Sequence, residues 1–250
     1  MSRPDPFPGP LDASDIPAAA DGESFVAVLR RAAGARGLPK PERTRITLLA
    51  ATAARLGAGI EPAALRVSDI AAEAGLAHGT FYRYFADRRA AVAALLAEFV
   101  RFLRDRLAES RAERPGGAPG SRDRVRAATL TYVRLFRDNA GLMRCLMDLG
   151  AEGAGFRDSF HALNRDWNGR VAAAIAHRRA ALAGTPPETA ETMLPTAYAL
   201  GGMIDEFLAQ LYLRRDPALA GLAGDEAAVA DLLTELWCRG AYGSLPQAFG

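Results

Sequence analysis

The chain has 250 residues, of which 50% are hydrophobic and 24% are charged, and its formal net charge is +2. This composition is ordinary for a soluble globular protein, and the small net charge gives no sign of a nucleic-acid binder. No apolar run is long enough to span a membrane, and the N-terminus lacks the basic and apolar regions of a signal peptide. We therefore expect a cytoplasmic protein with no membrane partner.

The composition also favours one fold class. Alanine dominates the apolar residues, and alanine is the strongest helix former. No stretch alternates β-branched or aromatic residues with polar ones at a period of two, which would be typical of strands. We therefore predict an all-α fold. The two cysteines, Cys145 and Cys238, lie outside any CxxC motif, so we expect free thiols, no metal site and no cofactor.

The N-terminal region, residues 1–40, divides into two parts. Residues 1–21 are rich in Pro and Asp and cannot bury much surface, so we expect them to be disordered. Residues 24–35 are expected to form one short helix. The extension as a whole is predicted to be flexible apart from that helix.

The first helix with a clear apolar stripe is predicted over residues 41–56. Ile46, Leu49 and Ala53 recur there at helical spacing, while charged residues occupy other positions. Gly57 is expected to end this helix, because glycine is common just after the last helical residue.

Residues 67–85 have the pattern of a helix-turn-helix. Ser68 is placed to cap a short helix over residues 68–74, and Gly75 permits a positive φ in the turn that follows. A second helix is expected over residues 78–85. Two short helices joined by a tight, glycine-containing turn are typical of this DNA-binding motif.

The second helix of the motif has two different faces. Phe81 and Phe85 share one face and are predicted to fill the core, together with Leu76 from the turn. The opposite face carries Gly79, Tyr82 and Arg83. A helix fits the major groove of DNA, where residues near its N-terminus reach the base edges.

The rest of the chain is predicted to consist of longer helices. Asp87 is placed to cap a helix over residues 88–113, and residues 114–120 have the Pro and Gly content of a linker. Pro195 is expected to kink one of the later helices or to mark its start. Residues 244–250 are expected to be a tail. The later helices are predicted over residues 121–137, 141–149, 156–182, 188–214 and 225–240.

The segment from Arg43 to Arg89 resembles the DNA-binding domain of the TetR family of bacterial transcriptional regulators. The resemblance rests on RITLLAATAARLGAG, on VSDIAAEAGLAHGTFYRYFADR and on the helix that follows. It implies a three-helix helix-turn-helix domain over residues 41–89 and a C-terminal helical ligand-binding and dimerisation domain over residues 90–243. The loop over residues 57–67 is longer than is usual in the family, as is the N-terminal extension.

The resemblance also implies which residues contact DNA. In this family the helix that carries GTFYRYF enters the major groove, and the starts of the neighbouring helices contact phosphates. By this resemblance, the residues expected to contact DNA are Ser68, His78, Gly79, Thr80, Tyr82, Arg83, Tyr84 and Arg88.

The last two long helices are expected to form a homodimer. In the TetR family these helices from each subunit pair into a four-helix interface, and here they carry more apolar residues than a solvated helix tolerates. A dimer would also place two reading helices about 34 Å apart, which suits a pseudo-palindromic operator. The expected interface residues are Met203, Phe207, Leu211, Leu233 and Trp237.

A ligand pocket is expected within the helices of the C-terminal domain. Methionine and aromatic side chains line adaptable apolar pockets, although they also fill ordinary cores. The scarcity of charge among the candidates predicts an apolar or aromatic effector. The candidates are Tyr132, Phe136, Met143, Met147, Phe160, Trp167 and Tyr198.

Together these features predict a repressor that a small effector releases from a palindromic operator. Two alternatives stay open: a DNA-binding regulator without a small-molecule effector, and an enzyme built on a helical bundle. A di-iron bundle enzyme needs Glu-x-x-His pairs on facing helices. The nearest match is a single Asp158-x-x-His161, so we expect no catalytic residues and no enzyme.

Overall fold

The computed structural model describes residues 22–112, 121–149, 154–184, 186 and 188–243. Throughout these ranges the chain forms helices and the loops between them, with no strand, so the predicted all-α fold is confirmed. The expectations for residues 1–21, 114–120 and 244–250 lie outside the described residues. No helix in the described ranges is long and apolar enough to cross a bilayer.

The chain folds into two compact units, which are described separately. Unit 1 comprises Met1–Arg106 and Asp138–Glu152, and unit 2 comprises Leu107–Arg137 and Gly153–Gly250. The division therefore passes through one long helix, whereas the sequence suggested a boundary after residue 89. The helix extends unit 1 because Leu95, Leu96 and Phe99 are fully buried.

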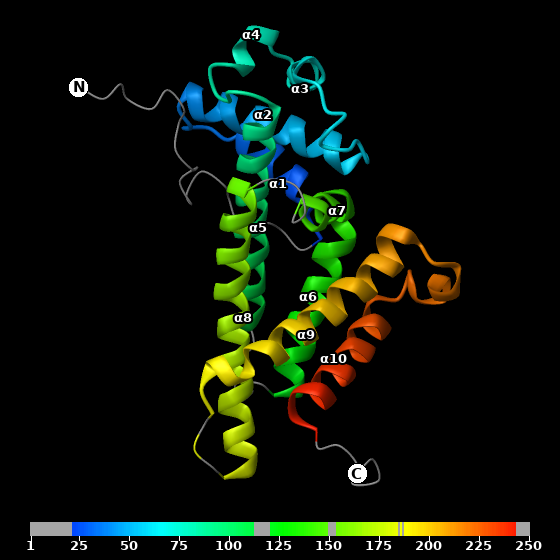
Figure 1. Ribbon diagram of the computed structural model, residues 1–250. Coiled ribbons are helices and arrows are strands. Elements are labelled where there is room, and N and C mark those ends of the chain that lie inside the picture. The colour runs from blue at the N-terminus through cyan, green and yellow to red at the C-terminus, as the bar shows by residue number, and fades with distance from the viewer. Residues whose placement is uncertain (1–21, 113–120, 150–153, 185, 187, 244–250) are drawn as a thin grey trace, which may run out of the picture. The chain divides into compact units, whose positions relative to one another are not determined.

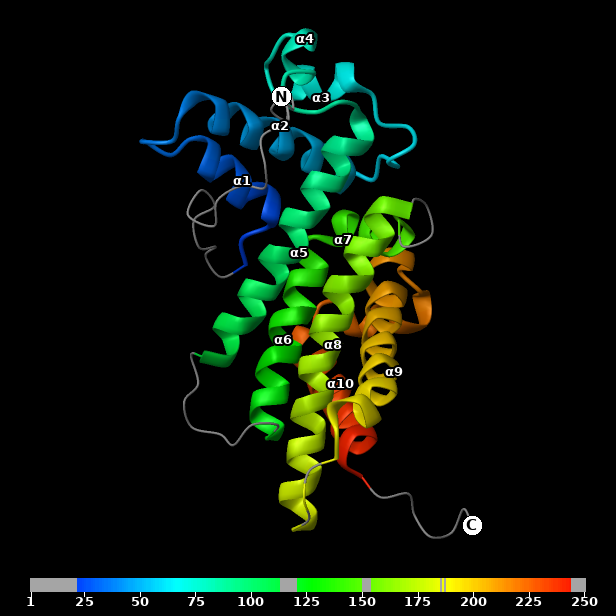
Figure 2. The same cartoon turned by 60° about the vertical axis from the view of Figure 1, so that its left-hand side comes forward.

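Unit 1 contains six helices of the described chain, with α3 and α4 next to α2 (Figures 1 and 2). Their bounds agree with the sequence prediction to within a few residues, except at α4. They are α1 Phe25–Ala33, α2 Lys40–Gly57, α3 Val67–Glu73, α4 His78–Phe81, α5 Arg88–Ala112 and α7 Ala140–Leu149.

The short helix expected in the N-terminal extension is present as α1, and it belongs to the core of unit 1. Its N-cap, Ser24, accepts a hydrogen bond from the amide of Ala27. Phe25 is fully buried, and its ring centroid lies 5.4 Å from that of Phe99 and 5.0 Å from that of Phe102. The α1 segment is therefore an integral part of the unit and not a flexible arm.

Helix α7 is fixed to unit 1 at two points. The side-chain oxygen of Asn139, just before α7, accepts a hydrogen bond of 2.8 Å from the amide of Phe25. Gly141 lies against the end of α2, where a Cβ atom on it would come within 2.7 Å of the Cα of Gly57. Only glycine allows the two backbones to approach this closely.

Unit 2 contains the remaining long helices. These are α6 Arg122–Asp138, α8 Ala154–Ala183, α9 Ala190–Leu208 and α10 Glu226–Tyr242. Helices α8 and α9 pack side by side, as Figure 2 shows. Arg126 on α6 forms a two-pronged hydrogen bond with Asp231 on α10, at 2.5 and 3.1 Å. Unit 2 is thus held by apolar packing and by polar contacts between α6 and α10.

The single helix predicted over residues 188–214 is interrupted. Helix α9 begins after its N-cap Thr189, so Pro195 lies inside the helix and does not mark its start. After Leu208 the backbone continues as a π-helical segment, Ala209–Arg214, and Arg215 ends it in the left-handed conformation with a φ of 52°. A π-helical segment widens the turn, and such segments occur frequently at functional sites.

Candidate nucleic-acid interface

The helix-turn-helix is formed by α3, a tight turn and α4. Gly75 adopts a φ of +66°, as its place in the turn predicts, and the amide of Leu76 donates to the carbonyl of Ala71 at 2.9 Å. Both sides of the motif are anchored in the core, because Ile70 is fully buried on α3 and Phe81 is fully buried on α4. The turn therefore holds two short helices at a fixed angle.

The apolar anchors of the second helix lie where the sequence predicts them. Phe81 and Phe85 are 0% and 3% exposed, and their ring centroids are 5.6 Å apart. Leu76, which was expected in the core, is only half-buried. The core contact of the turn is therefore weaker than predicted, while the two phenylalanines fix α4.

The opposite face of α4 is open to solvent. Tyr82 is 50% exposed, and its ring packs edge-on against His78 with centroids 5.4 Å apart. Gly79 has open space where a side chain would begin, since no atom lies within 4 Å of an added Cβ. Arg83 is also exposed, whereas Thr80 is half-buried. This face offers polar groups and a site where another molecule can approach the backbone.

Two local predictions for the motif are wrong. Ser68 does not cap α3: the helix begins at Val67, and the Ser68 hydroxyl contacts Asp69 instead, at 3.4 Å. Helix α4 ends at Phe81 and not at residue 85, because the amides of Arg83 and Tyr84 bond to carbonyls three residues back, as in a 3-10 turn. Ser68 is nevertheless exposed, and Tyr84, beyond the shortened helix, is half-buried.

Arg88 has a structural role that the sequence did not reveal. Its Nη1 donates to the carbonyl oxygens of Ala63 and Leu65, at 2.5 and 3.2 Å. It thereby fixes the loop that leads into α3, whose Leu65 is fully buried. The phosphate contact expected for Arg88 thus competes with this anchoring of the loop. By contrast, Asp87 caps α5 as predicted, accepting from the amide of Ala90 at 2.8 Å.

Helix α1 reaches the helix-turn-helix through an ion pair. Arg30 on α1 and Glu73 at the end of α3 lie 3.3 Å apart, with the Arg30 side chain 61% exposed. The sequence reasoning missed this contact. The helical spacing of Phe25, Val28, Leu29 and Ala32, all fully buried, indicates that α1 packs on a core, but it does not indicate the partner of Arg30.

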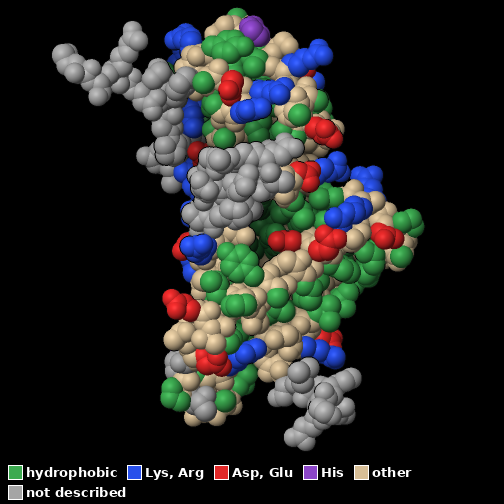
Figure 3. Space-filling model, viewed as in Figure 1, with side chains coloured by type: hydrophobic (Ala, Val, Ile, Leu, Met, Phe, Trp, Pro, Cys, Tyr) green, Lys and Arg blue, Asp and Glu red, His purple; other side chains and the backbone are tan. Residues whose placement is uncertain are grey.

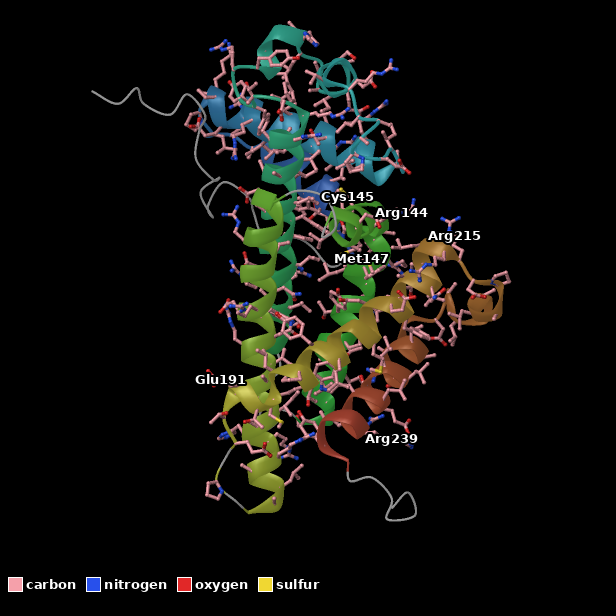
Figure 4. The ribbon with its side chains drawn as sticks, in the orientation of Figure 1. Arg144, Cys145, Met147, Glu191, Arg215 and Arg239 are labelled. Carbon is pink, nitrogen blue, oxygen red and sulfur yellow. The ribbon has the colours of Figure 1, made fainter. Side chains whose placement is uncertain are left out.

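The expected pocket residues do not form one set. Phe136 is buried and Tyr132 is half-buried on α6, with their ring centroids 6.3 Å apart. Met143 and Met147 lie on α7 in unit 1, where Met143 is buried and Met147 is exposed (Figure 4). The others belong to unit 2. Trp167 is half-buried, Tyr198 is 40% exposed, and the Phe160 side chain lies outside the described residues.

The expected interface residues also differ in how deeply they are buried within the subunit. Leu211 and Leu233 are 3% and 0% exposed, so they pack within the subunit's own core. Met203 and Trp237 are partly buried against a core cluster that includes Leu200, and Phe207 is half-buried. On the described parts of α9 and α10, the large apolar side chains that remain exposed are Tyr198, Leu232 and Leu236, at 40%, 38% and 41%.

The cysteines are free thiols, as expected. Burial, with a smaller effect from Asp148, raises the pKa of the Cys145 thiol on α7 to about 12 (Figure 4), so this group is not a nucleophile. Among the side chains that the structure describes, no three His, Cys, Asp or Glu residues gather in a way that could hold a metal ion.

Residues 49–95 match the model of a family described as bacterial regulatory proteins, tetR family. The match covers the end of α2, the whole helix-turn-helix and the start of α5. It agrees with the resemblance noted from the sequence. A comparison with curated proteins gives no match.

Solved structures share the fold over most of the chain. A transcriptional regulator from Pseudomonas aeruginosa PAO1 is 21% identical, with a TM-score of 0.62 over 81% of this chain and 91% of that one. A TetR-like regulator from Rhodococcus sp. RHA1 is 20% identical, with a TM-score of 0.58 over 83% and 100%. The FadR regulator of Bacillus subtilis, solved with stearoyl-CoA, is 15% identical, with a TM-score of 0.59 over 78% and 98%. Residues 49–95 therefore carry the sequence pattern of the tetR family, and the solved structures show that the chain as a whole shares the fold of these regulators.

Proposed function

We propose that the protein binds a DNA operator by inserting α4 into the major groove. The observation that carries the proposal is the division of α4 into a buried and an open face. Phe81 fixes the helix, while Gly79 and the half-exposed Tyr82 face outward. Small and hydrogen-bonding residues at this place suit contact with base edges and phosphates. Among the contacts expected from the sequence, His78 and Arg83 are also open to solvent.

The proposed regulator acts as a homodimer through α9 and α10. Hydrophobic side chains gather over α10 and the adjoining part of α9 on the face drawn in Figure 3. Leu232 and Leu236 are one helical turn apart and both exposed, and Tyr198 is exposed on α9. A second copy would cover these side chains, which replace the buried Leu211 and Leu233 as candidate contacts. Two copies of α4 would then read a pseudo-palindrome.

The proposed regulator is a repressor that an effector releases from DNA. The effector would bind unit 2 and favour a conformation of the dimer that fits the operator less well, which requires only different affinities for the two conformations. The FadR structure from Bacillus subtilis holds stearoyl-CoA, which supports a ligand-responsive role for this fold.

The DNA-binding role is tested by titrating a palindromic fragment from the gene's own upstream region. Thr80→Ala and Tyr82→Ala should each weaken binding about tenfold, because one good base or phosphate contact is worth about 1–3 kcal/mol. Leu182→Ala is the control, since Leu182 is a 56% exposed apolar side chain on α8. If the wild type and the three variants were folded and bound the fragment with equal affinity, α4 would not be the helix that contacts the DNA.

A further inference from the structure

A tyrosine and an aspartate meet inside unit 2. The Tyr132 hydroxyl on α6 donates to Oδ1 of Asp205 on α9, at 2.6 Å. Many protein atoms surround both groups, yet each residue keeps part of its surface accessible. Both groups therefore lie inside the unit and still keep some contact with solvent.

Among the residues that the structure describes, no cation pairs with the Asp205 carboxylate. Tyr132 is its one hydrogen-bond partner, and no ion pair to it occurs in the part of the chain that the structure describes. Burial raises the pKa of Asp205, and burial together with the nearby carboxylate raises the pKa of Tyr132. A buried carboxylate without a cation is costly, and such groups are found more often at binding sites than in structural cores.

Within the Tyr132–Asp205 pair, the polar atoms that can still bind another molecule are hydrogen-bond acceptors. The Tyr132 hydroxyl donates its one hydrogen bond to Oδ1 of Asp205, so the hydroxyl oxygen can only accept a further hydrogen bond. Oδ2 of Asp205 makes no hydrogen bond to any described residue and is not sealed from solvent. A molecule that binds here must therefore donate hydrogen bonds.

Aromatic rings flank the pair. Phe136 lies beside Tyr132 at a centroid distance of 6.3 Å, and the ring centroid of Tyr212 lies 6.4 Å from that of Phe136. Tyr212 belongs to the π-helical segment that follows α9, so the irregular backbone occurs next to this cluster. Aromatic faces attract cations as well as apolar groups.

We propose that Tyr132 and Asp205 form the polar end of the effector site, and that the site takes a protonated amine with an apolar or aromatic body. The ammonium group would donate to Oδ2 of Asp205 and to the Tyr132 oxygen. The half-buried ring of Tyr212, which packs on the fully buried Phe136, would contact the body. This inference rests on the proposed function, since it names the class of effector that the regulator senses. It narrows the earlier expectation of an apolar or aromatic effector, because an anionic head group would face an unpaired carboxylate.

The test uses two probes of similar shape and opposite charge, naphthalen-1-ylmethylamine and naphthalen-1-ylacetate, titrated into the full-length protein by calorimetry. The amine should bind, and Asp205→Asn should weaken it roughly tenfold or more, because hydrogen bonds to charged groups are the strong ones. Tyr132→Phe should weaken it less. Glu206→Gln is the matched control: it removes the neighbouring carboxylate on α9, which is exposed and paired with Arg214.

The outcomes separate the inference from the proposed function. Amine binding that depends on Asp205 and not on Glu206, with no binding of the acetate, supports the site. No amine binding, equal binding by wild type and Asp205→Asn, or tighter binding of the acetate overturns it, even where the protein binds its operator. Conversely, Asp205-dependent amine binding by a protein that does not bind DNA would keep the site and reject the regulator.

Discussion

At the scale of single residues, α4 separates anchoring from recognition. Phe81 is fully buried, whereas Gly79, two residues earlier, has open space around it. The sequence predicted this division from helical periodicity alone, because a helix turns about 100° per residue. It could not predict that Ser68 fails to cap α3, since capping depends on backbone geometry at one residue.

Gly79→Leu should abolish operator binding and leave folding intact. An added side chain at Gly79 meets no atom within 4 Å and the φ there is not positive, so the fold accommodates it. The same side chain would stand between α4 and the groove. We expect affinity to fall by about a hundredfold or more, since the added side chain would hold the helix away from the base edges and weaken several contacts at once. A melting temperature well below that of wild type would refute the premise that the position is open.

Asp205→Asn should stabilise the protein near neutral pH. Burial raises the pKa of Asp205 in the folded state, so ionisation opposes folding and stability falls as the pH rises through the unfolded value of about 3.9. The asparagine variant does not ionise at this position, so its stability does not fall in this way. The difference between its free energy of unfolding in urea and that of the wild type should therefore grow from about pH 4 to about pH 7.

Asp231→Asn is the contrast for that measurement. Its hydrogen bond with Arg126 lowers the pKa of Asp231, so the ionised form favours the folded state. Stability from this group is present at neutral pH and is lost as the pH falls through the folded pKa. The asparagine variant should therefore be the less stable one at neutral pH. If both substitutions changed the free energy of unfolding in the same direction at neutral pH, the conclusion that ionised Asp205 opposes folding would be contradicted.

At the scale of elements, helix positions were predictable and helix roles were not. The apolar spacing of α2, α5 and α10 located these helices to within a few residues. The role of α1 followed from contacts distant in sequence, such as that between Phe25 and Asn139. The sequence predicted a short helix there but not its place in the core, because composition does not reveal which long-range partner covers an apolar face. For the same reason, the anchoring of the loop by Arg88 could not be foreseen.

Phe25→Ala should destabilise unit 1 by about 3–5 kcal/mol, because it removes a fully buried aromatic ring that packs on Phe99 and Phe102. Operator binding should weaken with it. Arg30→Ala is the control on the same helix: it breaks the exposed ion pair with Glu73 and should cost less than about 1 kcal/mol. Chemical denaturation of both variants measures the difference, and equal losses would mean that α1 is not part of the core.

At the scale of the whole molecule, the proposed reading of a pseudo-palindromic operator requires two subunits. The sequence predicted an interface on the last two long helices, but it did not predict which of their apolar side chains stay exposed. Leu211 and Leu233 share the apolar character of Leu232 and Leu236, and only the packing within unit 2 decides which of them remain open. The same limit applies to the effector site, where hydrophobic candidates were evident and the polar pair of Tyr132 and Asp205 was not.

The double variant Leu232→Glu, Leu236→Glu should be a folded monomer. Both side chains are exposed in the single subunit, so the substitutions leave its core intact but place charges in the proposed interface. Light scattering should give half the wild-type mass, and operator affinity should fall by roughly a hundredfold or more through loss of bivalent binding. Leu182→Glu, on α8, should remain dimeric. If the double variant kept the mass of the wild-type protein, the dimer interface would not include Leu232 and Leu236.

The most direct test of the central claim is a DNase footprint of the purified protein on the region upstream of its own gene. The account predicts one protected segment with two symmetric half-sites, whose centres lie about one DNA turn or a small multiple of it apart. Protection should weaken steeply as the salt concentration rises, because phosphate contacts release counterions. A protein that is folded and dimeric but protects no segment, or protects all sequences equally, would contradict the claim that α4 reads an operator.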